Sequence, residues 1–196
     1  MFHLSCWKIK RLTKKIKLLQ LNRIHNQPSD QILKKEIAYY FELAARYKKL
    51  IGKKYAPFAE VMIVEAYKAA ANLNDAAAHY QLGLLFLNEG KFRLHLKEEG
   101  VFNSEENQKR ETAVFEQAHA HLYAAEKLSH VEAKRLRGLA IINGWGHIAD
   151  KNAGFELVVE SIEQEGSWDR VPQIFANMGL NKPEFFSAIM QRRKSF

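Results

Sequence analysis

The chain has 196 residues, enough for one compact domain or a short repeat array and too few for two large independent cores. Hydrophobic residues make up 47% and charged residues 27%, a balance that disfavours both wholesale disorder and a multi-span membrane protein. The chain holds only 4 prolines and 10 glycines, the residues most typical of turns. Because β-sandwiches and barrels need many turns, the composition predicts an all-α protein and disfavours those folds.

The net charge of +8 is unevenly distributed along the chain. Residues 1–54 contain 14 Lys and Arg against Asp30, Glu36 and Glu42, a net charge of +11. The remaining 142 residues carry 16 basic and 19 acidic side chains, a net charge of −3. The basicity therefore belongs to the first quarter of the chain, and a general classification as a nucleic-acid binder would misread it.

The first 27 residues predict a basic amphipathic helix that forms a separate N-terminal arm. Ile9, Leu12, Ile16 and Leu19 follow the 3,4,3 spacing of one helix face. Charges interrupt the apolar residues every two or three positions, so we do not expect a secretory signal peptide or a transmembrane helix. The candidate residues for membrane or anion binding are Trp7, Lys8, Lys10, Arg11, Lys14, Lys15 and Lys17.

Three interpretations of this arm stay open. It can pack its apolar face on a neighbouring helix as a solvated or capping helix. It can lie on an anionic membrane surface, with Trp7 and the Ile/Leu face in the interface and lysines near the headgroups. Nucleic-acid binding is the least favoured, because aromatic platforms and a recognised motif are missing and the rest of the chain is net acidic.

Residues 28–196 predict a single helical domain. Pro28 disfavours helix before it, and Ser29 or Asp30 can cap the next helix. Asp75 can cap another helix, which we expect to end at Gly90. The predicted helices cover residues 31–50, 58–73, 76–90, 110–128, 131–143, 151–163, 168–178 and 183–193, and we expect no strand.

The polar stretch at about 91–109 predicts a long loop or a partly ordered insertion. It contains Glu98, Glu99, Glu105 and Glu106 among Lys97, Lys109 and Arg110. A solvated loop is the first interpretation. The alternative is a partner-recognition loop, because long insertions in solenoids often project from the binding face.

The sequence contains an internal repeat with a shift of 55 residues. The shift superposes small or apolar residues at helical spacings: Ala69 on Ala124, Ala70 on Ala125, Leu73 on Leu128, Ala78 on Ala133, Gly83 on Gly138, and Leu84 on Leu139. This pattern predicts a helix, a short turn and a second helix, with small side chains that allow close packing of antiparallel helices. Gly83 and Gly138 each forgo about 1 kcal/mol of helix propensity, so we expect a tight contact at both.

At these residues the chain resembles the Sel1-like repeats, α/α solenoid units related to tetratricopeptide repeats. Ala133, Gly138, Gly144, Gly146 and Asp150 occupy the positions that the repeat pattern requires, although His147 stands where the pattern has Val. Residues 76–90 match only the opening of the pattern. The resemblance implies a TPR-like solenoid of helical hairpins. It also implies an adaptor role in signalling, in quality control or, in bacteria, in host interaction or secretion.

The chemical candidates have simpler structural interpretations. Glu116, His119, His121 and His130 could form a metal site, but His119 and His121 point about 200° apart on a helix. Cys6 lies in a basic arm without a rigid scaffold, so an incidental thiol is favoured over a nucleophile or an acylation site. The Gly-Trp-Gly at 144–146 lacks the residues of a phosphate loop and predicts an inter-helix turn. We expect no catalytic residue, cofactor or metal.

The sequence therefore predicts a non-catalytic protein-interaction scaffold or adaptor with protein partners. The alternative is a protein that attaches to a membrane surface, or to nucleic acid, through its basic helix. Because Cys6 is the single cysteine, we expect a reducing, cytoplasmic location, peripheral to a membrane or inside a host cell after delivery.

Overall fold

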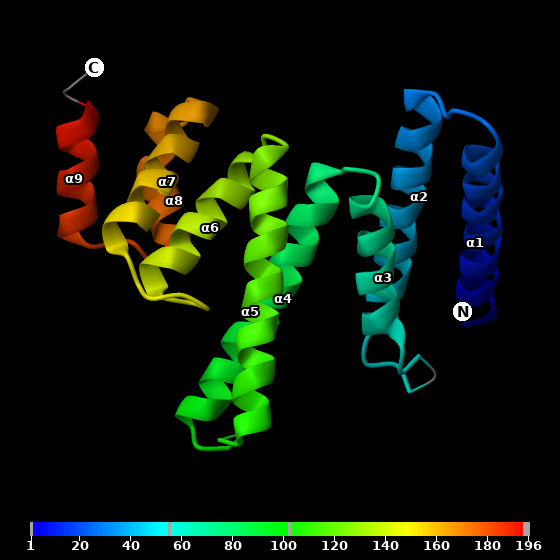
Figure 1. Ribbon diagram of the computed structural model, residues 1–196, viewed down its shortest axis with the longest axis horizontal. Helices are drawn as coiled ribbons and strands as arrows, with labels where there is room; N and C mark the ends of the chain where they lie inside the picture. Colours follow the sequence, from blue (N-terminus) through cyan, green and yellow to red (C-terminus); the bar gives the residue numbers. More distant parts are fainter. Residues whose placement is uncertain (1, 55, 102, 194–196) are drawn as a thin grey trace. The chain divides into compact units, whose positions relative to one another are not determined.

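The computed structural model describes residues 2–54, 56–101 and 103–193, in which every regular element is a helix (Figure 1). In chain order they are α1 (Phe2–His25), α2 (Asp30–Lys48), α3 (Ala59–Ala71), α4 (Ala76–Glu98), α5 (Glu105–Lys127), α6 (Val131–Asn143), α7 (Lys151–Glu165), the 3₁₀ helix η1 (Trp168–Arg170), α8 (Val171–Met178) and α9 (Pro183–Arg193). The predicted all-α class is confirmed.

The chain divides into two compact units, Met1–Leu82 and Gly83–Phe196. The division falls inside α4, whereas the sequence places a boundary after residue 27, between α1 and α2. The N-terminal unit has 15 Lys and Arg against 6 Asp and Glu, a net charge of +9, and the C-terminal unit has a net charge of −1. The charge asymmetry therefore follows the two units.

In the N-terminal unit, α2 packs against both α1 and α3. Leu12 and Ile16 of α1 are buried, and Leu43 and Ala44 of α2 are buried. From α3 the buried residues include Ile63, Ala66, Tyr67 and Ala70. The apolar stripe predicted on the first helix thus has a neighbour to pack on, since its two central residues are nearly inaccessible to solvent.

The C-terminal unit has one apolar core shared by its last four α-helices. This core contains Ile142 of α6, Phe155, Val158, Val159 and Ile162 of α7, Val171, Ile174 and Phe175 of α8, and Leu180, Phe185 and Ile189 at and before α9. Phe155 lies in contact with two other rings, with centroids 6.2 Å from Phe175 and 5.5 Å from Phe185. Burial of these large side chains is the main stabilising term for this end of the chain.

The prediction of a loop at 91–109 is wrong. The fourth helix continues to Glu98, the fifth begins at Glu105, and the two run side by side as the green pair in Figure 1. Gly90 does not end the helix: a Cβ there would lie 2.6 Å from the ring of Phe115, so this glycine gives α5 room to approach. The helix-ending glycine is Gly100, whose φ is +75°.

Charged pairs explain how a polar stretch becomes helical. Glu89 pairs with Arg93 at 2.7 Å, Glu105 with Lys109 at 2.7 Å and Glu106 with Arg110 at 2.5 Å, each at i,i+4 spacing. Lys97 of α4 reaches Glu111 of α5 at 3.6 Å. Such pairs each contribute about 0.2–0.5 kcal/mol to a helix, so the stretch is the solvated face of a helical hairpin.

The two copies of the repeat have the same turn geometry. Asn74 and Ser129, which the 55-residue shift superposes, are the two non-glycine residues with positive φ among the described residues, at 58° and 65°. Each next residue caps the following helix: Asp75 accepts from the N–H of Ala78 at 2.7 Å, and His130 accepts from the N–H of Ala133 at 3.3 Å. The shift therefore superposes backbone conformation and capping as well as residue types.

Candidate functional site

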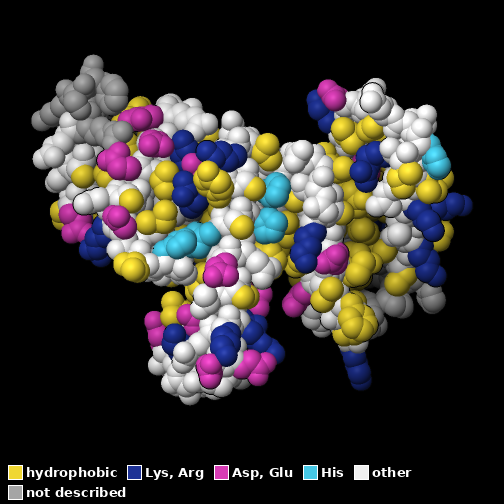
Figure 2. All heavy atoms as spheres, in the orientation of Figure 1, with side chains coloured by type: hydrophobic (Ala, Val, Ile, Leu, Met, Phe, Trp, Pro, Cys, Tyr) yellow, Lys and Arg dark blue, Asp and Glu magenta, His cyan; other side chains and the backbone are white. Residues whose placement is uncertain are grey.

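The outer face of α1 carries the candidate anion-binding side chains. Trp7, Lys8, Lys10, Arg11, Lys14, Lys15 and Lys17 are all exposed. Figure 2 shows dark-blue Lys and Arg side chains gathered along this helix. Ile9 and Leu19 are half-buried, beside the buried Leu12 and Ile16. The helix thus has one face against α2 and one basic face in solvent.

The basic face also exposes large apolar side chains. Trp7 and Leu18 are each 55% exposed, and Leu21 is 45% exposed. At about 100° per residue these three side chains lie within about 60° of one another, opposite the buried Leu12 and Ile16. Cations flank this second apolar stripe, which is the arrangement of a helix that lies in a membrane interface.

The positive charges on α1 are largely uncompensated. Residues 1–29 contain no Asp or Glu. None of the seven candidate side chains lies within ion-pair distance of a carboxylate among the described residues. The contacts found are with rings: Arg11 lies 5.4 Å from the ring of Trp7, and Lys15 lies 5.3 Å from the ring of Tyr39. The face therefore keeps a positive potential toward solvent.

A buried carboxylate joins α1 to α2. Glu36 is fully buried, and its Oε2 lies 3.3 Å from Nε of Arg23. The hydroxyl of Tyr40 donates to Oε1 of Glu36 at 3.1 Å and accepts from Nε2 of Gln20 at 2.8 Å. Burial, followed by the negative charge of Glu36, raises the pKa of Tyr40 to about 12. This network fixes the register of the two helices.

The predicted repeat-packing residues lie at close helix contacts. Ala70, Ala78, Ala125 and Ala133 are fully buried, and Ala69 and Ala124 are half-buried. A Cβ at Gly138 would lie 2.6 Å from the carbonyl oxygen of Gly154, and a Cβ at Gly83 would lie 2.7 Å from the side chain of Leu122. The first contact is the more restrictive, because a backbone atom of another helix cannot move aside easily.

The Gly-Trp-Gly segment forms the turn between α6 and α7. Gly144 and Gly146 have φ of +69° and +74°, which favour glycine. A Cβ at Gly146 would lie 2.4 Å from Cβ of Phe115, so the turn packs directly on α5. Asp150 then caps α7 by accepting from the N–H of Ala153 at 2.9 Å. The segment is a packed turn between helices.

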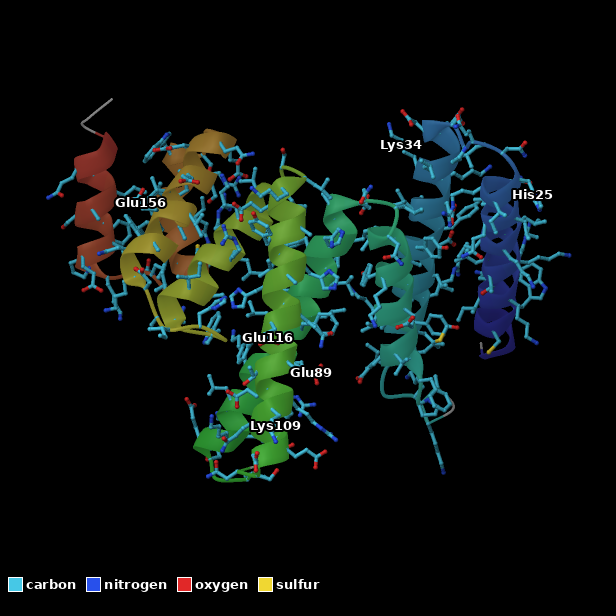
Figure 3. The ribbon with its side chains drawn as sticks, viewed as in Figure 1. His25, Lys34, Glu89, Lys109, Glu116 and Glu156 are labelled. Atoms are coloured by element: carbon cyan, nitrogen blue, oxygen red, sulfur yellow. The ribbon has the colours of Figure 1, made fainter. Side chains whose placement is uncertain are left out.

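The histidines considered above as metal ligands, and disfavoured in that role by the sequence, are held in separate structural contacts. Nε2 of His119 donates to the carbonyl oxygen of Trp145 at 2.6 Å, and its ring centroid lies 3.8 Å from that of His147. His121 stacks on Phe86 with centroids 5.8 Å apart. Glu116, labelled in Figure 3, is exposed on α5. In the part of the chain that the structure describes, no three His, Cys, Asp or Glu residues lie close enough to hold a metal ion.

Burial lowers the pKa of His119. The nearby charges of His147 and Arg137 act in the same direction, while the hydrogen bond to Trp145 opposes them. His119 is therefore held neutral inside the C-terminal unit, where it ties α5 to the turn that follows α6.

Sequence reasoning missed the Glu36 network and a pocket beside α1. The one available signal for the network was an acidic residue, four positions before a tyrosine, in a strongly basic stretch. The ion pair joins Arg23 and Glu36 from two different helices, and the periodicity within one helix does not predict a contact between helices.

Comparison with protein-family models, with curated proteins and with solved structures found no match to this chain. The likeness to Sel1-like repeats therefore rests on the residues described above. Within the described residues, no helix combines the length and the apolar character needed to cross a membrane.

Proposed function

We propose that this chain is a non-catalytic protein-interaction scaffold or adaptor, built as a TPR-like α/α solenoid of Sel1-like hairpins. The observation that carries the proposal is the repeated hairpin turn, in which Asn74–Asp75 and Ser129–His130 share positive φ and capping. Stacked hairpins give extended surfaces that bind other proteins. The same resemblance favours a bacterial host-interaction or secretion-related role, and the single cysteine, Cys6, favours a reducing, cytoplasmic location.

The proposal predicts a protein partner, and exposed apolar residues offer a way to test its binding surface. In the C-terminal unit Phe92 is 61% exposed and Tyr123 is 48% exposed. Affinity purification of the full chain from its native cell, followed by mass spectrometry, should recover a defined partner. A Phe92→Glu or Tyr123→Glu variant that keeps its helical signal should lose that partner if the substituted residue contacts it. Recovery of no protein above a control bait would count against the adaptor function.

A second candidate is attachment to an anionic membrane surface through α1. It is favoured by the exposed Trp7, Leu18 and Leu21 among cations that have no described carboxylate partner. Each basic residue near an anionic bilayer contributes about 1 kcal/mol, and buried apolar area adds to this. Attachment to nucleic acid would use the same cations without the apolar side chains.

Vesicle sedimentation separates these modes of attachment. The full chain should bind vesicles of phosphatidylcholine and phosphatidylserine, and the Leu18→Ser/Leu21→Ser variant should bind at least fivefold more weakly. Ile51→Ser is the matched control, because Ile51 is 45% exposed and lies outside α1. If the wild type does not bind vesicles, and both it and the Leu18→Ser/Leu21→Ser variant bind an oligonucleotide, then the basic helix binds nucleic acid and not a membrane.

A further inference from the structure

The N-terminal unit contains a pocket of about 460 Å³ between α1, the end of α2 and the segment that leads into α3. Cys6, Ile9 and Lys10 line it from α1, Tyr47 and Leu50 line it from the end of α2, and Met62 lines it from α3. Its volume falls in the range of pockets that take small-molecule ligands, about 300–1,000 Å³.

The chemistry of the pocket is an apolar cavity with one positive charge. Lys10 is the single charged side chain among the described lining residues, and its ammonium group has no carboxylate partner among the described residues. Tyr47 lies in the wall, and burial raises the pKa of its hydroxyl, so this residue adds no negative charge to the pocket. Apolar walls suit a hydrocarbon chain, and Lys10 suits an anionic head.

We propose that this pocket binds a free long-chain fatty acid, with the hydrocarbon chain against Ile9, Leu50 and Met62 and the carboxylate beside Lys10. Charge complementarity commits the site to an anionic ligand, since the whole N-terminal unit carries a net charge of +9. A cationic or neutral amphiphile has the same chain but no favourable head contact. The proposal goes beyond the adaptor function and does not depend on it.

Cys6 makes the proposal directly testable, because it is the single cysteine of the chain and lies in the wall of the pocket. The rate of its alkylation by iodoacetamide, a neutral reagent, should fall at least fivefold as dodecanoate is added below its micellar concentration. Dodecyltrimethylammonium at the same concentration should leave the rate unchanged.

Two variants and one control assign the protection to the pocket. Lys10→Gln should raise the half-saturating dodecanoate concentration at least fivefold. Lys34→Gln is the matched control: Lys34 is an exposed lysine of the same unit, on α2, and is not part of the pocket lining, so its response should equal that of the wild type. Ala56→Trp should fill the cavity and abolish the dodecanoate effect, which keeps the test valid if Lys10→Gln fails to fold.

Three results would overturn the proposal. The first is an unchanged alkylation rate in the folded wild type at saturating dodecanoate. The second is equal protection by the cationic amphiphile, which would remove the role of Lys10. The third is protection only by vesicles of phosphatidylcholine and phosphatidylglycerol, which would assign the pocket to a bilayer lipid.

Discussion

Gly138 of α6 and Gly154 of α7 face each other where the two helices pack together. A Cβ on Gly138 would meet the carbonyl oxygen of Gly154 at 2.6 Å, and a Cβ on Gly154 would meet the carbonyl oxygen of Gly138 at 2.5 Å. Each glycine therefore makes room for the backbone of the other. Helix propensity favours Ala at such positions, so the packing contact is the stronger requirement.

We predict that Gly138→Ala lowers the free energy of unfolding by about 1–3 kcal/mol, because the added methyl forces the two backbones apart. Gly83→Ala is the matched comparison, since its new methyl would meet the side chain of Leu122 at 2.7 Å, which can change rotamer, while the nearest backbone atom, Leu122 N, lies farther away at 3.2 Å. Urea unfolding of both variants measures the difference. A Gly138→Ala variant as stable as the wild type would contradict the tight contact.

His119 makes the C-terminal unit sensitive to mild acid. Its pKa is lowered in the folded chain by burial, so the unfolded chain takes up a proton first as the pH falls below about 6.5. The stabilisation from neutral His119 is therefore complete above that pH, and it is lost as the pH falls toward the folded pKa. Desolvation lowers the pKa of His79 in the same direction in the N-terminal unit.

We predict that the urea concentration at the midpoint of unfolding decreases as the pH is lowered from 7.5 to 5. His119→Gln should make this decrease smaller. The glutamine removes the titration and keeps a donor for the carbonyl oxygen of Trp145. The measurement is urea unfolding of both proteins at several pH values. An identical pH dependence in the two proteins would show that His119 does not carry the effect.

At the scale of the helix, α1 is held to α2 by a few buried side chains under a strongly basic exterior. Leu12 and Ile16 supply apolar burial, and Glu36 supplies the polar contact with Arg23. Arg23 is 37% exposed, so solvent screens the pair and its contribution is smaller than that of a fully buried ion pair. The network sets register, while the apolar contact provides most of the stability.

We predict that Glu36→Ala destabilises the docking of α1 by about 1–3 kcal/mol, because it leaves the Tyr40 hydroxyl without its acceptor and the Arg23 guanidinium without its ion-pair partner. Amide hydrogen exchange in residues 6–25 should accelerate more than exchange in α3. Glu42→Ala is the matched control on the same helix, since Glu42 pairs with Arg46 at the surface. Equal acceleration in both variants would argue against a specific anchor.

The sequence predicted most helices of this fold and missed the contacts between them. Periodicity, the cap Asp75 and the Gly-Trp-Gly turn placed most helices within a few residues of their observed ends, except at 91–109, where the predicted end at Gly90 was wrong. The error at 91–109 arose because charges at i,i+4 look like a polar loop when they are read linearly. The Glu36 network and the pocket join residues from different helices, so no local pattern in the sequence could reveal them.

At the scale of the whole molecule, net charge distinguishes the two units, whereas the hairpin turn is common to both. The N-terminal unit has a net charge of +9, which combines +11 in residues 1–54 with −2 in residues 55–82, while the C-terminal unit is close to neutral at −1. The repeated turns occur in both units, at 74–75 and 129–130. The proposed membrane attachment therefore draws on the charge of the N-terminal unit, and the proposed protein binding does not require that charge.

This division predicts where an anionic surface protects the chain from hydrogen exchange. With vesicles of phosphatidylcholine and phosphatidylserine, amides within residues 6–25 should gain protection, and amides within 83–190 should not. The protection should fade as salt rises from 50 to about 500 mM, because the Debye length shortens to a few ångströms. Neutral phosphatidylcholine vesicles are the control. Protection centred on residues 83–190 would assign membrane contact to the C-terminal unit and would contradict membrane binding by the basic face of α1.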